Sequence, residues 1–161
     1  MSVFQAQYTR ALKVIPSDNA NVPYPNLITS SLPTDKQTDK LIDENANFIT
    51  SNIQAGDIVY VQGNSSAATV LEVISATELL LNADIISDVN QPYFIYNASS
   101  QTSNAPQACY LYVGNAGDLT VTTAGQDIVT FFAVPAGTVL PIQVIKVHFT
   151  DTVAGKITAL W

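Results

Sequence analysis

The chain has 161 residues, of which 47% are hydrophobic and only 12% are charged, and its net charge is −7. This length allows one ordinary domain or two small ones with a sizeable core. Between Lys40 and Lys146 the sequence contains no Lys or Arg. Such an acidic surface repels phosphate groups, so we expect neither nucleic acid nor an anionic membrane as a partner.

Catalytic chemistry has little support in the sequence. The single cysteine, Cys109, cannot form an intrachain disulfide, and its apolar neighbours predict a buried thiol. His148 is the only histidine and is interpreted as a solvent-facing or interface residue. Without nucleotide-binding motifs or clustered metal ligands, we expect no catalytic residues, no cofactor and no metal, and therefore no enzyme.

Two routes to a membrane are also disfavoured. No apolar stretch approaches the roughly 20 residues that span a bilayer. The N-terminus has no basic segment followed by an apolar run, so we expect no signal peptide and synthesis in the cytoplasm.

The N-terminal part predicts a strand followed by irregular chain. Residues 8–15 alternate imperfectly between two faces, and the sequence Pro16-Ser-Asp-Asn19 then breaks the strand. An extended path is expected through the two prolines at 23 and 25. Residues 26–33 are interpreted as a linker or an edge segment. Thr34 and Gln37 have capping-box spacing, which predicts a short helical turn over about residues 35–45.

The segment from 48 to 96 predicts five short strands separated by turns rich in Gly, Asn and Ser. The candidate strands are residues 48–49, 57–61, 68–74, 78–82 and 93–96. The third and fourth are expected to form a hairpin with a short loop. This spacing favours a small, curved barrel of the SH3-like or OB-like kind.

Residues 97–107 contain no large apolar side chain and are interpreted as a linker. From Cys109 onward, short apolar runs alternate with clusters of Gly, Asp, Asn, Pro and Thr, which is typical of antiparallel strands with tight turns. The apolar runs are residues 110–113, 119–121, 128–132, 142–149 and 157–160. The sequence as a whole therefore predicts an all-β fold.

Three stretches of this C-terminal segment carry a family resemblance: LYVGNAGD at 111–118, VTFFAVPAGTVLP at 129–141 and the closing ITALW at 157–161. They are similar to a small structural module of tailed-bacteriophage particles, in which a strand ending in Pro-Ser-Asp often comes first. The resemblance implies one discontinuous β-sandwich or barrel from residues 1–24 and 105–161, with residues 25–104 inserted as a small β-barrel.

Two loops depart from the pattern of that family. The usual Ala-Gly-Gly-Asp turn reads Ala124-Gly-Gln-Asp127, and the loop before the last strand is Asp151-Thr-Val-Ala-Gly-Lys156. Because glutamine accepts a positive φ poorly, Gln126 predicts a different turn. Both departures fall in loops, where contacts to a specific partner can differ from one protein to another.

The resemblance implies a capsid decoration, or cement, protein on the outside of the virion. It would bind the outer surface of the major capsid protein lattice and stabilise the head, as a homo-trimer made in the host cytoplasm. A head-fibre, collar or tail appendage protein is an alternative. A second alternative is a host-glycan-binding β module that uses Tyr93, Tyr96, Tyr110 or Tyr112.

The extended N-terminal pieces, residues 1–9 and 19–33, are the segments most able to lie across a neighbouring subunit. The candidate interface residues are Phe4, Tyr8, Arg10, Tyr24, Leu27 and Trp161. Asp118 and Asp127 are interpreted as turn-forming side chains. A calcium site at Asp84, Asp88 and Asn90 matches no EF-hand spacing and is disfavoured.

Overall fold

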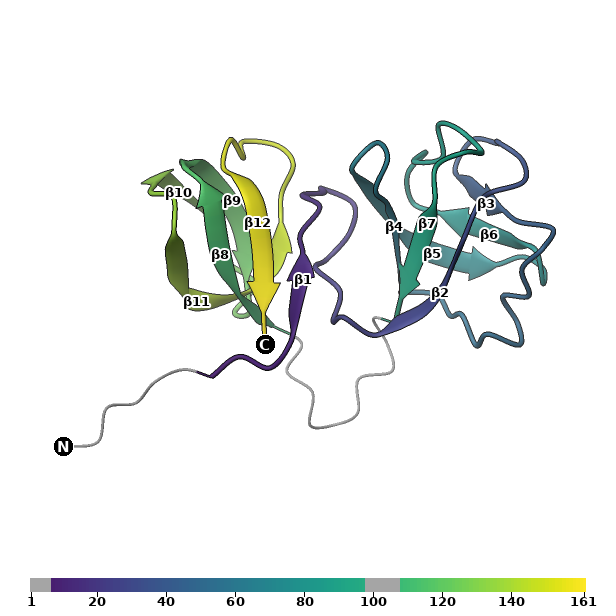
Figure 1. Cartoon of the computed structure of the whole chain (residues 1–161), viewed down its shortest axis with the longest axis horizontal. Coiled ribbons are helices and arrows are strands. Elements are labelled where there is room, and N and C mark those ends of the chain that lie inside the picture. Colours follow the sequence, from purple (N-terminus) through teal and green to yellow (C-terminus); the bar gives the residue numbers. More distant parts are fainter. Residues whose placement is uncertain (1–6, 98–107) are drawn as a thin grey trace.

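The computed structural model describes residues 7–97 and 108–161, which form twelve β-strands in two antiparallel six-stranded sheets (Figure 1). The prediction of an all-β chain built from sandwich-like or barrel-like modules is confirmed. Within these residues, no helix has the length and hydropathy to cross a bilayer.

The first sheet has the strand order β1-β12-β8-β11-β9-β10. Its strands are β1 (Ala11–Lys13), β8 (Cys109–Asn115), β9 (Gly117–Thr123), β10 (Ile128–Val134), β11 (Thr138–Val147) and β12 (Gly155–Leu160). The first half of β11 pairs with β8 and the second half with β9, with register shifts in both ladders. Such irregularities bend a strand, so the sheet folds over its own core.

The core of the first sheet follows from the alternation of apolar residues along its strands. Leu111 and Val113 of β8 and Leu119 and Val121 of β9 are fully buried in one apolar cluster with Val144 of β11. Successive side chains of a strand point to opposite faces, so each of these i, i+2 pairs lies on the same side of the sheet.

The second sheet has the strand order β2-β7-β4-β5-β6-β3. Its strands are β2 (Leu27–Ser31), β3 (Lys40–Ile42), β4 (Ile58–Val61), β5 (Ser66–Val73), β6 (Glu78–Leu81) and β7 (Tyr93–Tyr96). All four residues of β4 are buried, as expected for a strand covered on both faces. The predicted hairpin is confirmed, because β5 pairs with β6 in antiparallel register.

Residues 34–45 do not form the predicted helical turn. The Thr34 hydroxyl accepts a hydrogen bond from the backbone N–H of Glu44 (3.0 Å) rather than from a residue three positions along. Gln37 instead bonds to the Asp35 carboxylate (3.1 Å), and β3 pairs with β6. The capping-box spacing is a local signal, and here strand pairing across the sheet overrides it.

Three other predicted elements differ in extent. Residues 48–49 lie in a turn rather than a strand, because Phe48 is fully buried and anchors the turn in the second core. Only Ala11–Lys13 of the predicted strand 8–15 is a strand, since Val14 and Ile15 turn into two different apolar clusters. The segment 26–33 contains edge strand β2, which agrees with the edge interpretation.

A third apolar cluster lies between the two sheets, which sit side by side with β1 on the facing side of the first (Figure 1). The cluster joins side chains from the N-terminal segment to side chains of the second sheet: Ile15, Ala20, Ile58, Tyr60, Ala67 and Tyr96. Asn19 strengthens this junction, because its backbone carbonyl accepts hydrogen bonds from Thr69 (2.9 Å) and Asn82 (2.7 Å).

Candidate interaction site

Four of the six candidate interface residues contact one another or neighbouring residues. The Arg10 guanidinium lies 5.2 Å from the centre of the Tyr24 ring and donates to the carbonyl of Pro25. Tyr24 also packs edge-on against Trp161, with ring centroids 5.4 Å apart. Tyr8 contacts Tyr110 at 5.7 Å.

Trp161 is held in place rather than free at the end of the chain. Its backbone carbonyl accepts hydrogen bonds from the N–H groups of Thr9 (2.6 Å) and Arg10 (3.0 Å), and its ring packs on the first core. The aromatic rings of this group are therefore largely occupied by each other. Leu27 is exposed on edge strand β2, and Phe4 lies outside the described residues.

The tyrosines proposed as a glycan platform are dispersed, which counts against that alternative. Tyr93 and Tyr96 are buried and cannot stack on a sugar. The Tyr93 hydroxyl donates to the buried Asp43 carboxylate (2.6 Å), and burial raises the pKa of Tyr93 above its ordinary value. Tyr110 faces Tyr8, so of these four tyrosines Tyr112 alone offers an exposed ring.

The potentially reactive side chains considered in the sequence are buried or hydrogen-bonded within the fold. Cys109 is buried, as predicted, and burial raises the pKa of its thiol to about 12. Asp88 accepts two hydrogen bonds from Asn90 in a local turn. No cluster of three or more His, Cys, Asp or Glu side chains able to hold a metal occurs in the part of the chain that the structure describes.

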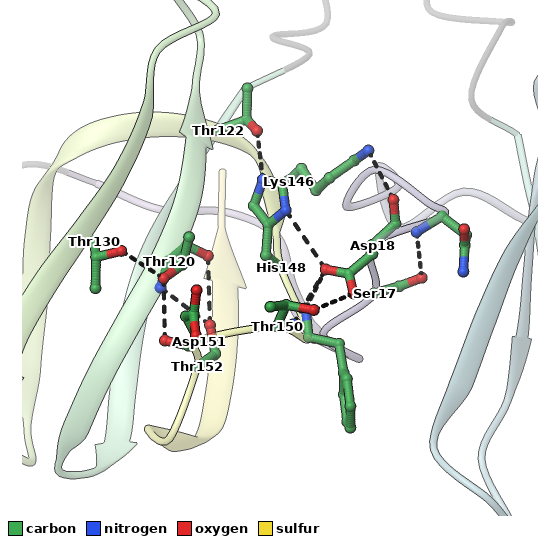
Figure 2. A network of polar contacts seen from close by, with 12 residues as sticks. Ser17, Asp18, Thr120, Thr122, Thr130, Lys146, His148, Thr150, Asp151 and Thr152 are labelled. Carbon is green, nitrogen blue, oxygen red and sulfur yellow. Dashed lines mark hydrogen bonds and ion pairs between the residues drawn. The ribbon is translucent and has the colours of Figure 1, made fainter.

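The loop between β11 and β12, residues 148–154, exposes two large apolar side chains. Phe149 is 71% exposed and Val153 is 75% exposed. The backbone around them is nonetheless firmly held. The Asp18 carboxylate accepts hydrogen bonds from the N–H of Phe149 (3.1 Å) and from the N–H (3.2 Å) and hydroxyl (2.7 Å) of Thr150 (Figure 2).

The Asp18 carboxylate is adapted to this role. Its pKa lies below the ordinary value, chiefly because the Thr150 hydroxyl donates to it, while partial burial acts in the opposite direction. His148 stands beside it, with Nδ1 3.6 Å from Asp18 and Nε2 2.7 Å from the Thr122 hydroxyl. His148 is thus a partner in a hydrogen-bond network that the sequence analysis did not identify.

Strand β9 holds the same loop from the other side. The carbonyl of Asp118 accepts hydrogen bonds from the N–H groups of Val153 (2.8 Å) and Ala154 (3.0 Å). The Thr120 hydroxyl bonds to the carbonyl of Asp151 (3.0 Å), and the Thr120 N–H donates to the Thr152 hydroxyl (3.0 Å), as Figure 2 shows.

This close approach explains Gly117 and corrects the interpretation of Asp118. A Cβ at Gly117 would lie 2.6 Å from the backbone nitrogen of Ala154, so only glycine lets the loop approach β9. The Asp118 carboxylate does not form a local turn, because it accepts the N–H of Ala133 across the sheet (2.8 Å). Asp127 does bond locally, to Thr123.

A cleft of about 700 Å³ opens between residues 21–23 and the β9–β10 hairpin. Its described lining contains amides, threonine, Lys146 and His148, but no carboxylate. The Nε2 of His148 is already engaged by Thr122. His148 therefore takes part in the polar network around Thr122 as well as in the lining of the cleft.

Comparison with known proteins gives no match: no protein-family model, no curated protein and no solved structure matches this chain. Among the described residues, the 148–154 loop is the candidate interaction site that we carry forward. A loop that is hydrogen-bonded on both sides and still exposes two apolar side chains is suited to contact another surface.

Proposed function

We propose that this chain is a structural protein of a tailed-bacteriophage particle, a capsid decoration protein that binds the outer surface of the major capsid protein lattice. The observation that carries a binding role is the 148–154 loop, which is held by Asp18 and Thr120 and exposes Phe149 and Val153. The virion as the setting comes from the resemblance of residues 111–118, 129–141 and 157–161.

A held loop favours binding for a physical reason. The ordering of mobile side chains and loops at an interface usually costs free energy and weakens binding. The 148–154 loop is already ordered by its hydrogen bonds to Asp18, Asp118 and Thr120. Burial of a side chain such as phenylalanine contributes about 2 kcal/mol. Repetition over a capsid lattice makes a modest contact at each copy sufficient to stabilise the shell.

The test is co-sedimentation with purified, expanded capsids that lack decoration protein. We expect saturable binding at a fixed ratio to the major capsid protein. The double substitution Phe149→Ser and Val153→Ser is expected to weaken this binding by at least about tenfold, because each side chain loses its buried contact. The hydrogen bonds of the loop backbone do not involve these side chains, so the fold is retained.

The matched control replaces two exposed apolar residues of the inserted segment, Ile49→Ser with Leu71→Ser. This control is expected to bind capsids like the unmodified protein, and circular dichroism melting checks that both double variants are folded. Unchanged binding of the Phe149→Ser, Val153→Ser variant contradicts the role of the loop. If the unmodified protein binds no shell at all, its place is in a collar or tail appendage rather than on the capsid.

A further inference from the structure

We propose that the cleft between residues 21–23 and the β9–β10 hairpin binds an extended peptide segment of another protein, and that Lys146 pairs with a carboxylate of that peptide. This second binding site does not depend on the capsid role, because Phe149 and Val153 do not line the cleft. The cleft volume of about 700 Å³ lies within the range of roughly 300–1,000 Å³ that is usual for ligand sites.

The walls of the cleft come from three parts of the chain and are held by backbone hydrogen bonds. Val22 donates its N–H to the carbonyl of Ile145 (2.8 Å), which ties the 21–23 segment to β11. Ala124 donates to the carbonyl of Gln143 (2.9 Å), which ties the hairpin to the same strand. Ile58 contributes to the lining from β4 of the second sheet. Because these walls are already in place, a ligand has little backbone to order.

The lining has a local charge opposite to that of the whole molecule. The chain contains thirteen acidic and six basic residues. The described lining of the cleft nevertheless includes Lys146 and His148 and no aspartate or glutamate. Repulsion from acids elsewhere on the chain is largely screened beyond about 8 Å at physiological ionic strength. A carboxylate that enters the cleft therefore responds chiefly to its lining.

The Lys146 ammonium has hydrogen-bonding capacity to spare. Its Nζ donates to the backbone carbonyl of Asp18 at 3.4 Å, which is long for such a bond. An ammonium group carries three donors. The ion pairs among the described residues join Lys40 to Glu78 and His148 to Asp18, and neither includes Lys146.

The neighbouring charged groups are already bonded elsewhere. The Asp18 carboxylate accepts hydrogen bonds from the 148–154 loop, while its backbone carbonyl meets Lys146 (Figure 2). The two ring nitrogens of His148 face Asp18 and the Thr122 hydroxyl. Lys146 is therefore the cation of the described lining that is best placed to take a carboxylate from outside.

The rest of the lining favours a peptide over a carbohydrate. Three side-chain amides, Asn21, Gln126 and Gln143, line the cleft. An amide offers both donors and an acceptor, which complement the C=O and N–H groups of a peptide bond. Ile58 and Ile145 add apolar contact area. The described lining contains no Phe, Tyr or Trp, the side chains on whose rings sugars usually stack.

The test compares two capped tripeptides that differ only in charge, one with glutamate at its centre and one with glutamine. Each is titrated to millimolar concentration into the whole ¹⁵N-labelled chain, and NMR follows the side-chain amides of Gln126 and Gln143. We expect saturable shifts with the glutamate peptide and about tenfold weaker binding of the glutamine peptide, because a hydrogen bond to a charged group contributes about that factor. Equal binding of the two peptides, or no shift with either, overturns the proposal.

Substitutions of lysine assign the carboxylate to its partner. Lys146→Gln is expected to bind both peptides equally, and Lys146→Arg is expected to keep the preference for glutamate because it keeps the charge. Lys156→Gln is the matched control, since Lys156 is exposed on β12 and lies outside the lining. The NMR spectrum of each variant shows directly that it is folded. A preference for glutamate that persists in Lys146→Gln contradicts the role of Lys146.

The peptide carboxylate can come from an acidic side chain or from a chain terminus, and a second pair of probes separates these sources. Trialanine with an acetylated N-terminus is used with a free and with an amidated C-terminus. Preferential binding of the free acid supports the site and identifies a C-terminal carboxylate as a ligand. Tighter binding of glucuronate than of all the peptides would overturn the peptide assignment in favour of an acidic sugar. None of these results bears on capsid binding through Phe149 and Val153.

Discussion

Gln126 holds a backbone conformation that its side chain disfavours. The sequence predicts that glutamine at this position alters the turn relative to the family pattern, and in the structure Gln126 has a φ of 73° within the β9–β10 hairpin. Its N–H bonds to the carbonyl of Thr123, and Thr123 in turn bonds Asp127 through backbone and side chain. These hydrogen bonds fix the backbone of the turn, so Gln126 keeps the left-handed conformation despite its steric cost.

The strain at Gln126 gives a prediction at this scale. We expect Gln126→Gly to raise the free energy of unfolding by about 0.5 kcal/mol, because glycine removes the steric cost of positive φ but adds unfolded-state entropy. Urea unfolding at neutral pH measures the change. Gln126→Ala is the control: it keeps a Cβ and is expected to show no gain, so equal stability of the glycine and alanine variants would argue against strain.

The candidate residues could be predicted from sequence by type but not by partner. Large side chains in extended or terminal segments predict interface residues at Arg10, Tyr24 and Trp161. The structure places them against each other, through contacts between residues that are far apart in sequence. Phe149 and Val153, by contrast, lie in a loop whose exposure depends on the packing of β9 beneath it, which no local pattern encodes.

At the scale of elements, the sequence was most informative where apolar and polar residues alternate. Each of the five C-terminal apolar runs contributes to one of the strands β8 to β12, because the two-residue period is a local property of the strand. The 148–154 loop could not be predicted in this way. Asp18 lies 132 positions before Thr150, so the bond that fixes the loop is set by the fold.

Asp18 also gives the loop a defined response to pH. Its pKa is lowered in the folded state, chiefly by the hydrogen bond from the Thr150 hydroxyl. A lowered pKa means that the carboxylate stabilises the fold fully above its unfolded value of 3.8 and that this contribution is lost as the pH falls further, through the folded value. Stability from this group is therefore constant near neutral pH and decreases only in acid.

We predict that Asp18→Asn lowers the free energy of unfolding at pH 7 by about 1 kcal/mol, a value reduced for the partial exposure of the carboxylate. The difference from the unmodified protein is expected to disappear when both are unfolded with urea at a pH well below 3.8. Asp84→Asn changes an exposed acid of the inserted segment and serves as the control. A difference that persists in acid would mean that charge on Asp18 is not the cause.

At the scale of the molecule, the two sheets are joined by a shared apolar cluster. Ile15 and Ala20 precede the second sheet in sequence but pack against Ile58 and Tyr60 of β4. Val14, the residue before Ile15, packs in the first core instead. Adjacent residues of one short segment thus tie two cores together, which predicts that the two sheets unfold in a single transition.

Ile15→Ala tests this coupling. Removal of a buried isoleucine side chain of this size is expected to cost about 2 to 4 kcal/mol through lost burial and a residual cavity. Since the cluster joins the segment that follows β1 to the second sheet, we expect the single calorimetric transition to broaden or to separate into two. Leu119→Ala, within the first core alone, is the control and is expected to lower the melting temperature of one transition without separating it.

The arrangement of strands along the chain also predicts an order of folding during synthesis. Strands β2 to β7 come from one contiguous stretch, so the second sheet can close as soon as residue 96 is available. Among the described residues, β1 pairs with β12 alone, and β12 is the last of these strands to be made. In the interval, Ile15 and Ala20 already have their apolar partners on the second sheet. We therefore expect the second sheet to hold the segment that follows β1 in place until the C-terminal strands are made and complete the first sheet.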